Sequence, residues 1–280
     1  MTMSRINASL QSIWNDHRPR VILVDAAGVL YTDDNSLSEM GRTIQRLSAE
    51  VPVWVATNNT SDSIPEIAHR LTHRGIHIPE SQIISSGLGL SVDSELRQLV
   101  ADQTVYTWGY PTSSVYVELA GGRSVDHPDD AEVIVLAAST GASTPSIMAM
   151  IQRSLRDRPR PVICINPDHF VQTGSGLYPV MGYYADQLAQ ALQIELIWMG
   201  KPYTAFSHVV AHVLAAAGVT TDSDLWFFDD NPKNVARMTL DLGISGATVM
   251  DTGLCKDLSL SEIESTFGCI PSTRIPSLLL

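Results

Sequence analysis

The feature of this sequence that most constrains its fold is the alternation of short apolar runs with longer amphipathic segments. The runs are continuously apolar and rich in β-branched residues, as are strands of a parallel sheet buried on both faces. The segments between them place apolar residues three and four apart, the spacing of a helix that packs one face on a core. This alternation predicts an α/β protein with a parallel sheet. The predicted strands are 21–24, 51–56, 82–84, 105–107, 133–137, 161–165, 194–198, 225–228 and 247–250, and the clearest helices are 64–74, 147–156 and 203–217.

Composition and charge argue against several functions. The chain has 280 residues, 44% of them hydrophobic, which is enough for one large domain or two modest ones. Its net charge of −12 repels phosphate backbones and anionic lipids, so we expect neither nucleic-acid nor membrane binding. The three cysteines have no C-x-x-C spacing, which disfavours a disulfide framework or a zinc ribbon and is typical of a reducing compartment. Residues 1–20 lack an apolar targeting segment, so the sequence predicts a cytoplasmic protein.

Polar side chains follow several predicted strands at the point where each strand ends. They are Asp25, 57–59, 166–168 and 229–231. In open α/β sheets, ligands bind outside the carboxyl ends of the strands, where such side chains meet. This clustering is the first indication of a functional site, although each motif alone is also typical of a turn or a helix cap.

The chemistry of these side chains favours an anionic ligand together with a metal ion. Adjacent carboxylates at Asp229 and Asp230 follow an apolar run, where they are costly unless a hard divalent ion such as Mg²⁺ lies with them. Thr57 and Asn58 offer hydroxyl, amide and backbone N–H groups that suit phosphate oxygens. Lys201 stands between a glycine and a proline directly after a predicted strand, so its ammonium can reach the same edge, although a solvated lysine is the alternative.

The order of these motifs resembles the haloacid dehalogenase superfamily. Asp25 comes first, then Thr-Asn-Asn at 57–59, then Lys201, then the Asp pair at 229–230. About 30 residues separate the first two motifs, which leaves no room for a cap domain there, whereas about 140 separate the second motif from Lys201. This spacing resembles subfamily IIA, the NagD-like and p-nitrophenyl phosphatase-like enzymes with a type IIA cap. Further similarities are ISSG at 84–87, INPD at 165–168 and GKP at 200–202.

The resemblance implies two domains and one discontinuous core. Residues 1–102 and 196–280 would form a Rossmann-like catalytic core with a parallel sheet, and 103–195 would form an inserted α/β cap of the C2 type. Such a cap closes over the strand ends, selects the substrate and offers the contact for a homodimer. We expect 268–280 to be a tail that is packed on the surface or partly loose.

The resemblance also implies a role for each candidate residue. Asp25 would be the nucleophile that forms an aspartyl-phosphate, and Lys201 would assist catalysis. Phosphoryl oxygens would be held by Thr57, the backbone of Asn58 and Lys201. The Mg²⁺ ligands would be Asp25, the main-chain carbonyl of Ala27, and Asp230, with Asp229 and Asn234 around them. Substrate specificity would reside in Asn166, Asp168 and His169.

One position departs from the family pattern. Relatives carry a second Asp two residues after the nucleophile, as general acid for the leaving alcohol, and this chain has Ala27 there. General acid–base assistance is worth about 10²- to 10⁴-fold, so its loss should slow ordinary ester hydrolysis. The sequence therefore predicts an atypical Mg²⁺-dependent hydrolase of a small phosphorylated metabolite.

Two alternatives to this function stay open. One is an impaired relative that binds a phosphorylated ligand without turning it over. The other is a C–P bond hydrolase, whose first motif is similar. Such enzymes place a Schiff-base lysine between the first two motifs, however, and this chain has no Lys between Asp25 and Thr57.

Overall fold

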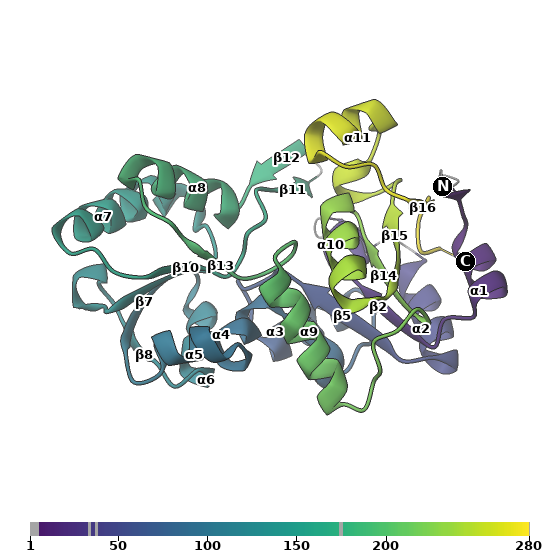
Figure 1. The fold of residues 1–280 in the computed structure, drawn as a ribbon, viewed down its shortest axis with the longest axis horizontal. Coiled ribbons are helices and arrows are strands. Elements are labelled where there is room, and N and C mark those ends of the chain that lie inside the picture. The colour runs from purple at the N-terminus through teal and green to yellow at the C-terminus, as the bar shows by residue number, and fades with distance from the viewer. Residues whose placement is uncertain (1–5, 33–34, 37–38, 174–175, 280) are drawn as a thin grey trace.

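The computed structural model describes residues 6–32, 35–36, 39–173 and 176–279, and it contains two parallel sheets side by side (Figure 1). The larger sheet has seven strands in the order β1-β16-β15-β14-β2-β5-β6, and the smaller has five in the order β13-β10-β9-β7-β8. Every pairing within these two sheets is parallel. The α/β fold with a Rossmann-like sheet is thus confirmed.

The strand bounds are as follows. The larger sheet consists of β1 Ile6–Asn7, β2 Val21–Val24, β5 Val53–Thr57, β6 Ile83–Ser85, β14 Leu225–Asp229, β15 Ser245–Val249 and β16 Thr273–Ile275. The smaller sheet consists of β7 Thr104–Trp108, β8 Arg123–Val125, β9 Val133–Leu136, β10 Val162–Cys164 and β13 Ile197–Trp198. Two antiparallel hairpins pair β3 Tyr31–Thr32 with β4 Asn35–Ser36, and β11 Phe170–Thr173 with β12 Gly176–Pro179.

Helices cover both faces of the sheets. Their bounds are α1 Leu10–His17, α2 Met40–Glu50, α3 Ile64–His73, α4 Gly89–Val92, α5 Ser94–Val100, α6 Val115–Leu119, α7 Thr144–Asp157, α8 Met181–Leu192, α9 Thr204–Ala216, α10 Pro232–Leu242 and α11 Leu260–Phe267. In Figure 1, α7 and α8 lie on the smaller sheet, and α10 and α11 lie with the larger one. Among the described residues, none of these helices combines the length and the apolar character needed to cross a membrane.

Alternate residues of each central strand enter different apolar clusters. Ile22 and Val24 of β2 pack with α1, α2 and α3 on one face of the larger sheet. Leu23, between them, belongs to a cluster on the other face that also contains Val133 and Ile163 of the smaller sheet. One continuous apolar cluster therefore joins the two sheets. A third cluster lies between the smaller sheet and α7 and α8.

The structure differs from the sequence-based expectations at two segments. The predicted core begins at residue 196, but β13 at Ile197–Trp198 pairs with β10, so the smaller sheet extends past that boundary. The expectation of a surface tail at 268–280 is wrong, because Thr273–Ile275 forms β16 between β1 and β15. The side chains of Ile275 and Leu278 are buried in the core, which explains why this segment is held.

Candidate active site

Two adjacent strands of the larger sheet bring three carboxylates together. β2 ends at Val24 and pairs with β14, and the backbone N–H of Asp25 donates to the carbonyl of Phe228 at 2.8 Å. Asp25 therefore emerges beside the end of β14, whose last residue is Asp229 and which Asp230 follows. Carboxylate oxygens of these three residues lie within 4.8 Å of one another, and all three residues are buried. Such a cluster attracts cations.

Lys201 lies inside this carboxylate cluster. Its Nζ is 2.7 Å from Oδ1 of Asp25 and 2.7 Å from Oδ2 of Asp229, and its side chain is 1% exposed. Burial by itself lowers the pKa of Lys201, but the carboxylates of Asp229, Asp25 and Asp168 raise it above its ordinary value. The ammonium is thus charged, and it offsets part of the negative charge of the cluster.

Asp229 is fully engaged by its neighbours. It accepts hydrogen bonds from Lys201 Nζ at 2.7 Å, from the backbone N–H of Asn231 at 2.8 Å, and from Nδ2 of Asn234 at 3.1 and 3.2 Å. Asp229 thus contacts Lys201, Asn231 and Asn234 at the same time. Asn234 has a different feature, because its Oδ1 is buried and has no hydrogen-bond partner among the described residues. An unpaired buried acceptor beside a carboxylate cluster suits a metal-bound water.

A tight turn after Asp25 brings Asp230 close to the backbone. Gly28 has a φ of +89°, and a Cβ there would lie 2.2 Å from Oδ2 of Asp230, so only glycine fits. Oδ2 of Asp230 also accepts from the backbone N–H of Leu254 at 2.6 Å. Ala27 lies in the same turn and lines the cavity described below. The carboxylate of Asp230 and the turn at 26–28 are thus fixed against each other.

Burial and crowding raise the pKa values of two carboxyls in the cluster. Desolvation raises the pKa of Asp25 to about 7, although Lys201 opposes the shift and Asp229 adds to it. Desolvation, Asp229 and Asp25 likewise raise the pKa of Asp230 well above its ordinary value. Three carboxyls facing one ammonium therefore favour the uptake of either protons or a cation.

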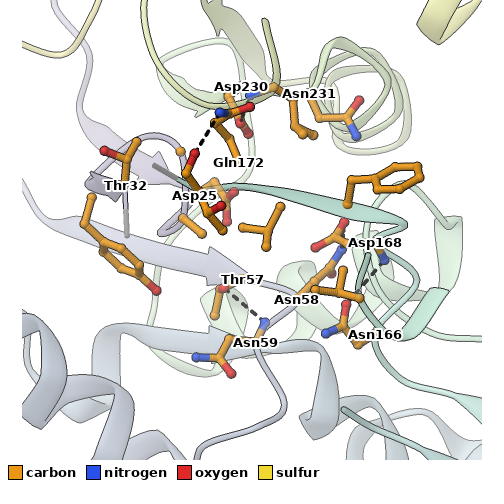
Figure 2. A pocket seen from close by; sticks show the side chains of 18 of the residues that line it. Asp25, Thr32, Thr57, Asn58, Asn59, Asn166, Asp168, Gln172, Asp230 and Asn231 are labelled. Carbon is orange, nitrogen blue, oxygen red and sulfur yellow. Dashed lines mark hydrogen bonds between the residues drawn. The ribbon is translucent and has the colours of Figure 1, made fainter. Parts of the chain in front are cut away.

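A cavity of about 440 Å³ opens beside the cluster (Figure 2). One side is formed by the strand ends of the larger sheet, with Asp25, Thr57 and Asp230. The other side is formed by Asn166 and Asp168 after β10, together with the whole of β11. The cavity thus joins residues from both sheets, and all four groups that the sequence placed at strand ends contribute to its lining.

Asn58 links three segments through its side chain. Its Oδ1 accepts from the backbone N–H of Lys201 at 2.8 Å, and its Nδ2 donates to the carbonyl of Lys201 and to Oδ1 of Asp168, both at 2.9 Å. The sequence pointed to the backbone of Asn58 as a phosphate ligand and gave no indication of this side-chain role. Its partners are 110 and 143 residues away, which explains why the sequence did not show it.

His169 lies apart from the cavity. Its Nε2 is 3.0 Å from Oδ2 of Asp186 on α8, its side chain is 50% exposed, and it is absent from the cavity lining. Of the three residues predicted to select the substrate, the structure brings Asn166 and Asp168 into the cavity and leaves His169 outside.

The sequence missed several lining residues. Arg70 of α3 is the one cation among the described residues of the lining, and its NH1 is paired with Oδ2 of Asp62 at 2.6 Å. Phe170 and Gln172 of β11 also line the cavity. In sequence, an arginine on an amphipathic helix looks like any solvated surface residue. A short hairpin likewise carries no signal that marks it as part of a site.

Comparisons with known proteins support the family resemblance. Residues 22–122 match the family of haloacid dehalogenase-like hydrolases. A dihydroxyacetone phosphatase from Corynebacterium glutamicum (strain R) is 28% identical over 251 residues, which are 79% of this chain and 89% of that protein.

Solved structures share the whole fold. A possible sugar phosphatase of the HAD superfamily from Cytophaga hutchinsonii superimposes with a TM-score of 0.79 at 21% identity, covering 99% of each chain. A p-nitrophenyl phosphatase from Archaeoglobus fulgidus gives a TM-score of 0.76 at 21% identity, covering 93% of this chain and 97% of that one. Part of this chain, residues 22–122, thus matches the haloacid dehalogenase-like hydrolases, and the chain has the fold of NagD and the p-nitrophenyl phosphatases.

Proposed function

We propose that this protein is a Mg²⁺-dependent phosphatase that hydrolyses a small phosphorylated metabolite through an aspartyl-phosphate on Asp25. The observation that carries the proposal is the position of Asp25 at the cavity, within 2.7 Å of a buried ammonium and beside Asp230. The names of the related proteins support it, because they include a dihydroxyacetone phosphatase and a p-nitrophenyl phosphatase.

The residues around Asp25 fit a divalent cation. Asp25 and Asp230 present carboxylate oxygens, and Asn234, whose Oδ1 lacks a partner among the described residues, lines the same cavity. We infer that Asp25, the carbonyl of Ala27 and Asp230 would hold Mg²⁺, with Asp229 and Asn234 orienting the groups around it. When bound, Mg²⁺ would offset the negative charge of the carboxylates and of the transferred phosphoryl group.

Nucleophilic attack, phosphoryl binding and substrate selection are assigned to residues of the chain itself. The carboxylate of Asp25 attacks phosphorus, and Lys201 fixes its orientation through the 2.7 Å contact. Thr57, the backbone of Asn58 and Lys201 stand at the carboxyl edge, where they would bind phosphoryl oxygens. We further propose that 103–195 acts as the cap, with its sheet completed by β13, and that Asn166 and Asp168 select the substrate. The homodimer contact through this segment stays a prediction.

The lining of the cavity suits a substrate whose charge resides mainly in its phosphate. Arg70 is paired with the carboxylate of Asp62, and Asn59 and Ser61, which also line the cavity, are uncharged. The cavity of about 440 Å³ suits a small ester with hydroxyl or carbonyl groups. A panel of phosphorylated metabolites, assayed with Mg²⁺ and with a chelator, tests the proposal.

Ala27 favours a second candidate function, the binding of a phosphorylated ligand without turnover. The same panel separates the two. Turnover that depends on Mg²⁺ supports the phosphatase, whereas binding of phosphorylated compounds with no hydrolysis of any ester supports the binding protein.

Replacing Asp230 with Asn should weaken Mg²⁺ binding at least about tenfold, because one of the proposed carboxylate ligands becomes a neutral amide. Titration calorimetry with MgCl₂ measures the effect. The exposed Asp126→Asn variant is the matched control and should bind like the wild type. Equal Mg²⁺ affinity in Asp230→Asn would show that the ligand assignment is wrong.

The stability of the metal-free protein should fall as the pH rises from about 4 to about 7. The folded-state pKa of Asp25 is raised from 3.8 to about 7, so folding favours its protonated form, and the stability present below pH 4 is lost through this window. Mg²⁺ binds the deprotonated carboxylates and should offset the loss. Thermal unfolding in EDTA and in MgCl₂ should therefore show a larger Mg²⁺-induced rise in Tm at pH 8 than at pH 5. An equal rise at both pH values would contradict this account.

A further inference from the structure

We propose that Asp168, in the segment after β10, donates the proton to the leaving alcohol in place of the carboxyl missing at position 27. The proposal rests on the phosphatase function proposed above and assigns the catalytic acid of that site. It also revises the expectation, drawn from Ala27, that ordinary ester hydrolysis is slowed for lack of a general acid.

Few acidic groups that line the cavity could donate this proton. The described residues that line it offer three carboxyls, Asp25, Asp168 and Asp230, and one phenol, Tyr31. Asp25 is the proposed nucleophile, and Asp230 is held against Gly28 and the N–H of Leu254. Burial raises the pKa of Tyr31, so its phenol is a poor proton donor near neutral pH. Asp168 is the one carboxyl of this group that is neither the proposed nucleophile nor a proposed metal ligand.

The hydrogen bonds of Asp168 leave one oxygen available. Oδ1 accepts from Nδ2 of Asn58 at 2.9 Å, and no hydrogen bond to Oδ2 is found among the described residues. The amide of Asn58 is itself fixed by two bonds to the backbone of Lys201. Asn58 therefore defines which oxygen carries the proton, and it is a positioning residue for Asp168.

Asp168 is also connected to the nucleophile through Asn58 and Lys201. Asn58 joins it to the backbone of Lys201, whose ammonium lies 2.7 Å from Asp25. The segments approach so closely that a Cβ at Gly200 would lie 2.5 Å from Cδ of Pro167 and 2.8 Å from Oδ1 of Asn58. The residue beside Asp168 is thus packed directly on the segment that carries Lys201. Desolvation raises the pKa of Asp168 to about 6 against the opposing effect of Lys201, so a useful fraction is protonated near neutrality.

The proton balance closes over the two half-reactions. In the first, an oxygen of Asp25 bonds to phosphorus, the bond from phosphorus to the leaving oxygen breaks, and that oxygen takes the proton from Oδ2 of Asp168. In the second, water attacks the aspartyl-phosphate, its proton passes to the Asp168 carboxylate, and the bond between Asp25 and phosphorus breaks. The sum is ester and water giving alcohol and inorganic phosphate.

The test compares leaving groups on matched variants. Asp168→Asn keeps an oxygen that accepts from Asn58 but has no acidic proton. With Mg²⁺ saturating, kcat/KM for glycerol phosphate should fall about 10²- to 10³-fold in this variant, while p-nitrophenyl phosphate, whose leaving group needs little protonation, falls less than about tenfold. Ala27→Asp in the Asp168→Asn background should restore alkyl ester hydrolysis. Asp126→Asn, the same chemical change at an exposed site, should leave both rates near wild type.

Several outcomes would overturn the proposal. A uniform loss for alkyl and aryl esters in Asp168→Asn would indicate binding or folding, and no loss would exclude the residue. If the wild type already shows a steep dependence on leaving-group pKa, no acid is acting, whatever the variants do. If Asp33→Asn or Asp34→Asn, at positions outside the described residues, reproduces the alkyl-specific loss instead, the acid lies there. A wild type that hydrolyses neither ester would overturn the phosphatase function itself, and this outcome is distinct from the others.

Discussion

Replacing Asp25 with Asn should lower the turnover of every phosphate ester by at least about 10⁴-fold, because the amide cannot form the covalent phosphoryl intermediate. The variant should stay folded. Its amide oxygen can still accept from Lys201, and the cluster loses a carboxylate whose charged form is disfavoured by burial.

Two measurements check this prediction. Steady-state assays on p-nitrophenyl phosphate give the loss of rate, and acid quenching with a ³²P-labelled substrate should trap label on the wild type but not on Asp25→Asn. Asp126→Asn, the same chemical change at an exposed site, should behave like the wild type in both. Label on the Asp25→Asn protein would place the nucleophile elsewhere.

Replacing Lys201 with Met should impair both stability and activity. The change leaves Asp25 and Asp229 buried without their common cation, which typically costs about 3–5 kcal/mol in the free energy of unfolding. Activity should fall by roughly 10²- to 10³-fold, as when one preorganised charge is removed from an active site. Urea unfolding in EDTA at pH 8 and assays of p-nitrophenyl phosphate measure the two effects.

A double variant separates these two roles of Lys201. Lys201→Met combined with Asp229→Asn removes one of the unpaired carboxylates and should recover part of the stability but none of the activity. Lys256→Met, at an exposed lysine, should change neither. Unchanged urea midpoints in Lys201→Met would contradict the pairing of the ammonium with the carboxylates.

The parts of the fold that could be predicted from sequence are those with local signals. β2 and β14 are continuously apolar and end in carboxylates, so both the strands and the position of Asp25 and Asp230 at one sheet edge follow from the pattern. β16 could not be found, because its three residues include Arg274 and carry no run of apolar side chains. Only the long-range packing of Ile275 and Leu278 holds that segment in the sheet.

The site shows the same division between local and long-range information. Residues at strand ends were predictable, but the direction of neighbouring side chains in a loop was not. Asp168 turns toward Asn58 and the cavity, whereas the next residue, His169, turns toward Asp186. In sequence, both are polar residues after the same predicted strand. Only their contacts with segments far along the chain show which of them faces the cavity.

The apolar cluster shared by the two sheets limits how the molecule can move. Leu23 and Phe227 of the larger sheet belong to the same buried group as Val133 and Ile163 of the smaller one. Swinging the sheets apart would expose this group to water, at a free-energy cost that grows with each square ångström uncovered. Substrate exchange through a wide opening of the whole smaller sheet is therefore disfavoured, and entry depends on the few side chains at the rim of the cavity.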